Sequence, residues 1–262
     1  MSSEARLVEI AVNDGVASLM LNRPENGNAI DVPMAAALRS ALSACLNDSR
    51  LRAIVISGAG RMFCSGGSLK TIQGAGEQSP AYVRDILFHL HDAIGIIARI
   101  PVPVIAQVHG SAAGAGFALA MSCDFVVAAK SARFLMAYTA VGLTPDGSSS
   151  YFLPRLIGLR RSLELTLRNR ALSAEEAADW GIVNEIVDDE MLAKSVAGLA
   201  VELAAGPTAA FGAAKRLLRA SYNNDLDAQM TLECETLCDA LTKPEAAIGL
   251  AAFAAKQRPK FR

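Results

Sequence analysis

Residues 109–117 read His109-Gly-Ser-Ala-Ala-Gly-Ala-Gly-Phe117, and they join one apolar segment, 103–108, to another, 117–122. Segment 103–108 has the short apolar pattern of a buried strand, whereas 117–122 is predicted to be helical. Small residues let a ligand approach the backbone closely, and the first N–H groups of a helix have no partner inside the helix. The stretch therefore predicts a strand, a tight turn and a helix whose amino end can bind an oxygen atom.

A second glycine-containing loop, Phe63-Cys-Ser-Gly-Gly-Ser-Leu-Lys70, follows another predicted strand, 52–57. Two backbone N–H groups that converge on one point bind a carbonyl oxygen and stabilise it as an oxyanion. Either loop alone is more typical of a tight turn or a packing contact, because glycine-bearing turns are common. An oxyanion site is the functional alternative, and it requires the two loops to meet.

Strands and helices alternate over the first part of the chain. Apolar runs predict strands at 6–12, 15–21, 52–57, 103–108, 124–128 and 182–187, with a hairpin turn at Asn13-Asp14-Gly15 between the first two. Helices are predicted at 31–46, capped by Asp31, at 80–98 and 117–122, and at 175–180, capped by Ser173. This alternation is typical of an α/β fold.

From about residue 191 the pattern is helical only, with Pro207, Pro244 and Pro259 as breaks. We therefore divide the chain into an α/β core, 1–190, and a C-terminal helical region, 191–262. Alanine-rich helices after an α/β core predict a lid or an assembly surface.

The composition excludes several classes of protein. The 262 residues are 52% hydrophobic, and 25 Lys and Arg residues balance 26 Asp and Glu residues. Such a chain is globular and has no overall attraction to nucleic acid or anionic membranes. The apolar block 93–121 is interrupted by charged residues and prolines, so it does not predict a membrane span. We expect neither nucleic acid nor membrane as a partner.

The five cysteines predict neither disulfides nor a metal site. Cys234 and Cys238 are four residues apart, but no second Cys or His pair completes a zinc site. His89 and His91 would face different directions on a helix, so they do not predict a metal ligand pair. No basic and apolar leader opens the sequence. We therefore expect reduced, buried thiols, no metal, and a cytoplasmic location.

Carboxylates are scarce around the two loops. Between Ala93 and Leu163 they are Asp124 and Asp146 alone. Asp124 follows a helix end, where its side chain is expected to bind backbone N–H groups. Asp146 lies in a Pro-Asp-Gly turn, which is its ordinary role. Apolar neighbours would alternatively desolvate it and raise its pKa, as a base that works near neutral pH requires.

Four segments together resemble the crotonase superfamily, the enoyl-CoA hydratase/isomerases. They are 21–29 (LNRPENGNA), 63–70 (FCSGGSLK), 109–124 (HGSAAGAGFALAMSCD) and 172–183 (LSAEEAADWGIV). The resemblance covers nearly the whole chain. It implies a spiral of ββα units with a C-terminal helical trimerisation region, assembled as homotrimers or as hexamers made of two trimers.

The resemblance also implies the site. The oxyanion hole would be the N–H groups of Gly67 and Ala115, and Asp146 would be the catalytic carboxylate. Alanine keeps the second N–H where the family usually has glycine, provided that the backbone there needs no positive φ. The coenzyme A thioester would enter as substrate, with no other cofactor. The implied substrate-binding residues are Asn22, Arg23, Ala29, Ser65, Gly66, Ser68, Leu69, Lys70, Gly114 and Tyr138, with Phe253 and Lys256 contributed by a neighbouring subunit or else ordinary surface residues.

Departures from the family pattern indicate the reaction. Hydratases of the family use two glutamates, where this chain has Ala118 and Tyr138. The Pro-Asp-Gly turn at Asp146 instead resembles the enoyl-CoA isomerases that use a single Asp or Glu. The prediction is an isomerase; a hydratase and a non-catalytic acyl-CoA-binding protein remain as alternatives. Apolar residues that could line an acyl pocket, or equally the core, are Leu87, Phe88, Leu135, Met136, Tyr138, Tyr151 and Phe152.

Overall fold

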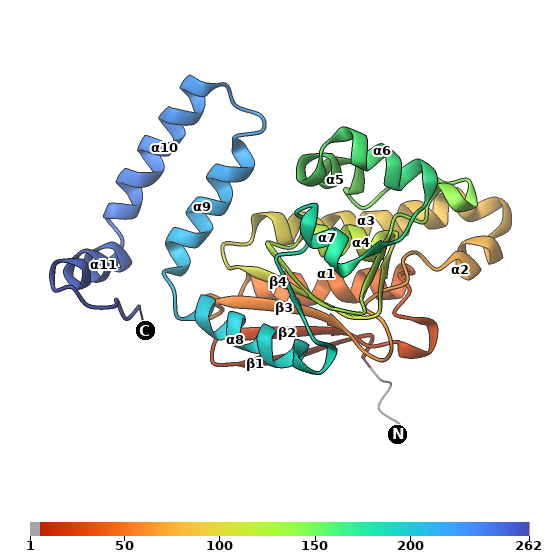
Figure 1. Cartoon of the computed structure of the whole chain (residues 1–262), viewed down its shortest axis with the longest axis horizontal. Coiled ribbons are helices and arrows are strands. Elements are labelled where there is room, and N and C mark those ends of the chain that lie inside the picture. The colour runs from red at the N-terminus through yellow and green to blue at the C-terminus, as the bar shows by residue number, and fades with distance from the viewer. Residues whose placement is uncertain (1–5, 262) are drawn as a thin grey trace.

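Two sheets organise the structure, a computed structural model that describes residues 6–261 (Figure 1). The first sheet has the order β1 (Val8–Asn13), β2 (Val16–Leu21), β3 (Ala53–Gly58), β4 (Val104–Val108), β6 (Phe125–Ala129) and β9 (Glu185–Val187). The second consists of β5 (Ser111–Ala113), β7 (Arg133–Leu135) and β8 (Leu172–Ser173). The six predicted strands are the six strands of the first sheet.

The predicted hairpin is confirmed. Strands β1 and β2 pair antiparallel with Asn13 opposite Val16, and the turn residues Asp14 and Gly15 both have positive φ angles, 48° and 78°. Two positive φ angles are what a tight turn between twisted strands needs, and Asp and Gly tolerate them. The other neighbours in the first sheet are parallel, so helical crossovers must connect them.

The helices follow the strands in a repeating order. They are α1 (Val32–Leu46), α2 (Leu69–Gly74), α3 (Ser79–Arg99), α4 (Ala115–Ser122), α5 (Ser149–Ile157), α6 (Leu159–Arg168), α7 (Ala174–Asp179), α8 (Leu192–Ala204), α9 (Thr208–Ala220), α10 (Leu226–Leu241) and α11 (Pro244–Ala254). Short 3-10 turns lie at Pro24–Asn26, Gly76–Gln78, Thr139–Val141 and Asp189–Met191. Both predicted caps are present: the Asp31 carboxylate accepts from Met34 N, and Ser173 forms a capping box with Glu176.

The chain coils through both sheets in turn, which confirms the spiral of ββα units. After β4 it passes through β5 and then α4, and after β6 it passes through β7 and then α5. The turn that begins with β3 adds a single bridge residue, Cys64, which pairs with Ala112 of the second sheet. Each turn thus places a loop and the start of a helix at the same edge, where the two glycine-containing loops lie.

Asp124 ties the end of α4 to the sheet and to α9. Its carboxylate accepts from Val104 N at 2.9 Å and pairs with Lys215 at 2.5 Å and Arg219 at 3.3 Å. The expected role in binding a backbone N–H is therefore confirmed. The two cations are partners that the local sequence did not indicate, because α9 is far away along the chain.

Helix α8 belongs with the core rather than with the C-terminal region. It packs against β3, β4 and β6 through buried residues such as Val196 and Ala200. Helices α9–α11, from Thr208 on, extend beyond this sheet (Figure 1), and α9 stays tied to the core by the ion pairs of Lys215 and Arg219 with Asp124. Because α10 stands away from the core, its Cys234 and Cys238 are exposed, contrary to the expectation of buried thiols.

Within residues 6–261, none of the helices has on its own the length and hydropathy to cross a membrane; the segments Asp189–Ala204 and Thr208–Ala220 meet that criterion only when joined across a 100° bend.

Candidate active site

The two glycine-containing loops lie side by side. Cys64 N donates to Ser111 O at 3.1 Å, and Ala113 N donates to Cys64 O at 3.0 Å. Gly66 follows with a φ of +99°, and a Cβ added to it would lie 2.8 Å from Ala113 O and 3.6 Å from Ala115 N. Only glycine allows this approach, because a side chain at position 66 would collide with Ala113 of the loop 109–117.

The two expected donors are the N–H groups of Gly67 and Ala115. Gly66 O accepts from Ile30 N, and Ser68 N donates to Ile30 O, so the intervening Gly67 N–H faces the opposite side. Ala115 is the first residue of α4 and has no positive φ, which satisfies the condition on alanine. Among residues 6–261, neither the Gly67 N–H nor the Ala115 N–H has a hydrogen-bond partner. Two unpaired donors at the meeting of the loops can hold one oxygen atom.

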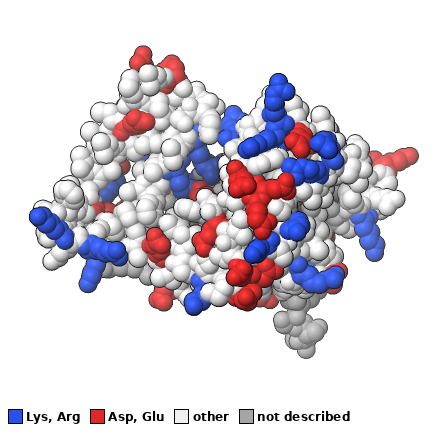
Figure 2. All heavy atoms as spheres, viewed as in Figure 1, with Lys and Arg blue, Asp and Glu red and all other residues white. Residues whose placement is uncertain are grey.

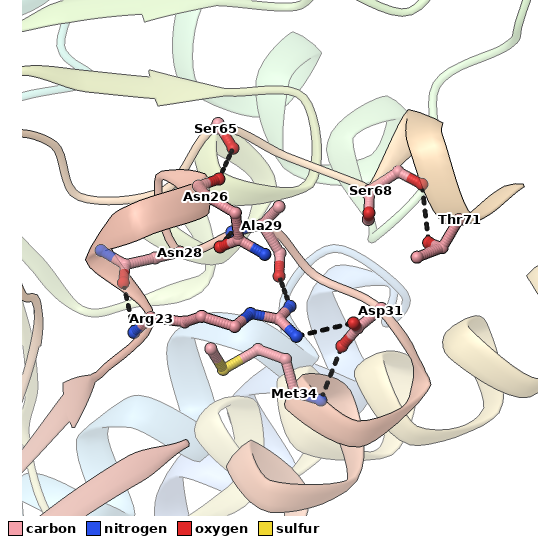
Figure 3. Close-up of polar contacts among 9 residues, drawn as sticks. All are labelled: Arg23, Asn26, Asn28, Ala29, Asp31, Met34, Ser65, Ser68 and Thr71. Atoms are coloured by element: carbon pink, nitrogen blue, oxygen red, sulfur yellow. Dashed lines mark hydrogen bonds and ion pairs between the residues drawn. The ribbon is translucent and has the colours of Figure 1, made fainter. Parts of the chain in front are cut away.

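Asn28 joins the segment 21–29 to the start of the loop 63–70, and Figure 3 shows its bond to Arg23. Its side chain is fully buried, and its Nδ2 donates to Ala59 O, Met62 O and Phe63 O at 2.9, 3.0 and 3.1 Å. Its Oδ1 accepts from Arg23 N at 2.9 Å. The sequence reasoning missed this residue, since an Asn in a polar loop is typical of a turn and its partners lie in a distant segment.

Replacing Asn28 by Ala is expected to lower the free energy of unfolding by about 3 kcal/mol or more, because it leaves several buried backbone groups without partners. Asn28 also has a φ of +56°, which Asn tolerates better than Ala. The matched control is Asn47→Ala, at an exposed position with one bond to Ser43 O, where a change within about 0.5 kcal/mol is expected. Urea unfolding of the two variants measures the difference, and equal losses would contradict the role given to Asn28.

The guanidinium of Arg23 lies between two groups of its own segment (Figure 3). It pairs with Asp31 at 2.7 Å and donates to Ala29 O, and its side chain is 16% exposed. Burial acts to raise the pKa of Asp31, but the hydrogen bonds from Arg23 and Met34 N lower it below its ordinary value. Asp31 also caps α1. Arg23 and Ala29 thus hold the loop that supports Gly66 and Gly67. Their contact with coenzyme A stays a prediction.

A pocket of about 480 Å³ opens at Gly67 and at Gly114, the residue before Ala115. Its lining consists of Ser65, Gly66, Gly67, Leu69, Ile72, Ser79, Pro80, Val83, Leu87, Gly114, Ala137, Tyr138, Val141, Leu143, Thr144 and Asp146. Most of these side chains are apolar, and the titratable ones are Tyr138 and Asp146. The lining therefore suits an apolar group that is attached to a polar head, with one carboxylate to act on it.

Asp146 is partly buried in this pocket, and its Oδ1 accepts a hydrogen bond from Tyr138 Oη at 2.6 Å. Burial raises the pKa of Asp146, although the Tyr138 bond and the nearby His91 act to lower it. Asp146 is therefore a partly desolvated carboxylate, and the Pro-Asp-Gly turn holds it at the pocket. A carboxylate with a raised pKa can exchange a proton near neutral pH.

The turn that carries Asp146 sits on two helices. Gly147 has a φ of +55°, and a Cβ added to it would lie 3.0 Å from Ala118 Cβ of α4 and 3.6 Å from Leu90 Cδ2 of α3. Ser149 N and Oγ both donate to Asp146 O, at 2.9 and 2.5 Å. The alanine at position 118 therefore makes room for the turn.

Seven of the fifteen predicted site residues line this pocket, and three more are next to them in sequence. Ser65, Gly66, Gly67, Leu69, Gly114, Tyr138 and Asp146 line it, Ala115 follows Gly114, and Ser68 and Lys70 adjoin it. Asn22 turns aside, because its Nδ2 donates to Glu9 Oε1 at 2.7 Å. Phe253 is 84% exposed on α11, at the far end of the molecule from α2, so it does not reach the pocket of its own chain (Figure 1); Lys256, just beyond α11, is exposed as well.

The apolar candidates divide in the same way. Leu87 and Tyr138 line the pocket, Met136 is buried in the core, Leu135 is half-buried on β7 outside the pocket, and Phe88 is exposed. Tyr151 and Phe152 line a different recess, between α5 and α9, where Figure 2 shows Lys and Arg atoms.

The pocket lining also includes Pro80 and Val83, which the sequence analysis did not predict. Their spacing with Leu87 along one face of α3 is the signal that could have indicated them. In the described part of the chain, no three His, Cys, Asp or Glu side chains are grouped so that they could hold a metal ion.

Comparison with known proteins agrees with this arrangement. A sequence profile described as enoyl-CoA hydratase/isomerase matches residues 11–262. The 1,2-epoxyphenylacetyl-CoA isomerase of Escherichia coli K12 is 38% identical over 252 residues, which are 95% of this chain and 96% of the relative. A "Probable enoyl-CoA hydratase" of Rhodobacter capsulatus is 38% identical over 256 residues, 97% of each chain.

Among solved structures, an enoyl-CoA hydratase from Polaromonas sp. JS666 superimposes with a TM-score of 0.93 at 35% identity, covering 97% of this chain and 99% of that one. The match therefore extends over both sheets, the two donor loops and the C-terminal helices. This chain belongs to the enoyl-CoA hydratase/isomerase family of the crotonase superfamily.

Proposed function

We propose that this protein is an enoyl-CoA isomerase, which moves a carbon–carbon double bond of an acyl-CoA by a proton shuttle on Asp146. The observation that carries the proposal is the pairing of one carboxylate of raised pKa with two unpaired backbone N–H groups in a single apolar pocket. The E. coli relative is named as an isomerase of an acyl-CoA, which supports the same class of reaction.

The reaction needs a base and an oxyanion site. The thioester oxygen of a 3-enoyl-CoA binds between the N–H groups of Gly67 and Ala115. Asp146 removes a proton from C2, the electrons move into the carbonyl, and the two donors hold the enolate oxygen. Each donor of this kind contributes on the order of 3 kcal/mol to the transition state. Asp146 then returns the proton to C4, so that the double bond lies between C2 and C3 and the carboxylate is regenerated.

The rest of the pocket binds without reacting. Leu69, Ile72 and Leu87, which line the pocket, pack on the acyl group in this proposal. The loop of Ser65–Lys70, with Arg23 and Ala29 of the segment that supports it, contacts the coenzyme A portion. The thioester is itself the substrate, so the reaction as proposed uses no metal or redox cofactor. We place the protein in the cytoplasm, where the exposed thiols of Cys234 and Cys238 stay reduced.

Assembly as a homotrimer, or as a hexamer of two trimers, is part of the proposal. Helices α9–α11 extend from the core and expose large apolar side chains such as Leu237, Leu250 and Phe253. A neighbouring copy packed on this surface buries them and brings its own Phe253 and Lys256 toward coenzyme A. Sedimentation at micromolar concentration tests the assembly.

The alternative is hydration of a 2-enoyl-CoA, which the names of the Rhodobacter relative and of the Polaromonas structure favour. A water held by Tyr138 and Asp146 would then add to C3. The lining is against this alternative, because Asp146 is the one carboxylate among the described residues that line the pocket, and hydration as proposed needs a second to share the proton transfers.

Incubation with 3-enoyl-CoA and crotonyl-CoA in separate reactions distinguishes these activities. An isomerase converts the first into a conjugated thioester of unchanged mass, followed by its ultraviolet absorbance, and leaves crotonyl-CoA without a gain of 18 mass units. Water addition as the faster reaction overturns the assignment. A non-catalytic acyl-CoA-binding protein binds the thioester but exchanges no C2 proton for deuterium in D₂O.

Replacing Ala118 by Glu is expected to abolish isomerisation without creating hydration. Ala118 is 1% exposed and supports the Asp146 turn, so a glutamate there displaces the turn or buries a charge, and overpacking alone costs about 1–3 kcal/mol. Ala118→Ser is the matched control and is expected to keep its activity. Crotonyl-CoA absorbance and thermal unfolding measure both effects, and a gain of hydration in Ala118→Glu contradicts the reasoning.

A further inference from the structure

Both the backbone and the side chain of Tyr138 are held in place by neighbouring residues. It is 9% exposed, and its backbone oxygen accepts from Val141 N at 3.1 Å and from Leu143 N at 3.0 Å. The residue before it, Ala137, has a φ of +64°, a left-handed conformation that is unfavourable for alanine. This reversal of the chain and the bonds that follow it fix where the phenol ring points.

The ring of Tyr138 connects the base to the oxyanion loops. A Cβ added at Gly114 would lie 3.8 Å from Tyr138 Cζ and 3.8 Å from Gly66 Cα, so the phenol end of the ring packs beside the residue that precedes Ala115. On its other side, its hydroxyl donates to Asp146 Oδ1 at 2.6 Å. One rigid side chain therefore spans the gap between the donors and the carboxylate.

The hydrogen bond leaves the two oxygens of Asp146 unequal. Oδ1 is occupied by Tyr138, whereas Oδ2 has no hydrogen-bond partner among the residues that the structure describes. A proton shuttle needs one oxygen that can reach both substrate carbons, and a carboxylate that rotates would lose this alignment.

We propose, on the basis of the isomerase function above, that Tyr138 is a positioning residue: it holds Asp146 by Oδ1 so that Oδ2 alone removes and returns the substrate proton. Burial, followed by the nearby Asp146, raises the pKa of Tyr138, so the phenol stays protonated and keeps donating. It serves neither as base nor as acid in the reaction.

The surroundings of Asp146 allow a clean test by titration. The titratable groups that act on its pKa are Tyr138, from the segment before the turn, and His91 of α3. Helices α4 and α5 contribute Ala118 and the Ser149 hydroxyl, which do not titrate in the working range. Because the Tyr138 bond lowers the pKa of Asp146, its loss raises that pKa.

The test compares Tyr138→Phe with Tyr151→Phe, a control outside the pocket whose hydroxyl has no partner within the described residues. Carbon-13 NMR titration of the Asp carboxylates, assigned with Asp146→Asn, is expected to show a higher pKa for Asp146 in Tyr138→Phe and an unchanged one in Tyr151→Phe. An unchanged Asp146 pKa in Tyr138→Phe overturns the proposal. A merely structural ring would not move it, because Phe preserves the packing.

A second measurement concerns the proton itself. With 3-enoyl-CoA deuterated at C2, the wild-type protein is expected to carry part of the label to C4, and Tyr138→Phe is expected to lose it to solvent. The kcat of Tyr138→Phe is expected to be about 10- to 100-fold lower than that of the wild-type protein, with little change in KM. Equal label transfer in both proteins overturns the proposal. If the wild-type protein isomerises no enoyl-CoA, the proposed function fails, and the NMR titration decides the role of Tyr138.

Discussion

Replacing Asp146 by Asn is expected to lower the turnover of an enoyl-CoA by about 10²- to 10⁴-fold, the usual contribution of a general acid–base group. Asn has nearly the same shape and can still accept the hydrogen bond from Tyr138, which the structure places at Oδ1. It cannot take a proton from C2 or return one to C4. Binding of an unreactive acyl-CoA analogue, measured by calorimetry, is expected to change less than about threefold, because the apolar lining and the two backbone donors remain.

The same substitution is expected to preserve or increase stability at neutral pH. Burial raises the pKa of Asp146 above its unfolded value, so the protonated form is favoured in the folded state. The stability gained from this preference is fully present below the unfolded pKa, near 4, and is lost as pH rises through the folded pKa. The wild-type protein at pH 7 therefore bears a partly buried charge that Asn removes. Thermal unfolding of both proteins at pH 4 and pH 7 measures this, and the stability of the Asn variant relative to the wild-type protein is expected to be higher at pH 7 than at pH 4.

These two results must occur together for Asp146 to be the catalytic base. A loss of activity with a large drop in the melting temperature indicates misfolding rather than missing chemistry. A variant that keeps most of its turnover contradicts the shuttle directly. The pH profile gives a further check, because the wild-type rate is expected to fall as pH drops through the raised pKa of Asp146, where the base becomes protonated.

The features that the sequence predicts well are those set by neighbouring residues. The Asp14-Gly15 turn, the Asp31 cap and the six strands of the first sheet each depend on a local pattern, namely a residue pair that accepts positive φ, a carboxylate before a helix, and continuous apolar runs. The donors Gly67 and Ala115 differ from these features, because the resemblance to the family implies them and their role stays a prediction. The Gly67 N–H is unpaired because its neighbours Gly66 and Ser68 bond to the distant Ile30.

The second sheet could not be predicted from the residues alone. Its strands have three residues or fewer, too short to show a period of two, and Cys64 joins it as a single bridge. Helix α8 raises a related difficulty, since its pattern indicates a helix but not the surface on which the helix packs. Its place against β3, β4 and β6 follows from the sheet, which is formed by segments far away in sequence.

Within the site, the least predictable contacts join distant segments. The hydrogen bond from Asn28 Nδ2 to Phe63 O joins residues that are 35 positions apart, and the sequence around Asn28 does not indicate it. Ala118 and the Gly147 turn likewise lie close together although they belong to different segments of the chain. A small side chain at position 118 leaves space for the turn that carries Asp146.

Replacing Gly116 by Ala is expected to lower kcat/KM by about 10²- to 10³-fold, the effect of losing one oxyanion donor. A Cβ at this position would lie 2.5 Å from Cys64 O and 2.6 Å from Cys64 Cβ, contacts that no side chain tolerates. Cys64 O also accepts from Ala113 N, so the collision pushes apart the two loops that carry Gly67 and Ala115. Overpacking is expected to lower the free energy of unfolding by about 1–3 kcal/mol as well.

The matched control for Gly116→Ala is Gly198→Ala, in helix α8, where an added Cβ would meet no atom within 4 Å. Alanine there is expected to stabilise the protein by about 0.4–1 kcal/mol, because it restricts the unfolded chain, and to leave activity unchanged. Kinetics with 3-enoyl-CoA and urea unfolding, performed on both variants, separate the two positions. Wild-type activity in Gly116→Ala would mean that the loops do not act as one oxyanion site, since the collision with Cys64 must then be relieved without moving either donor.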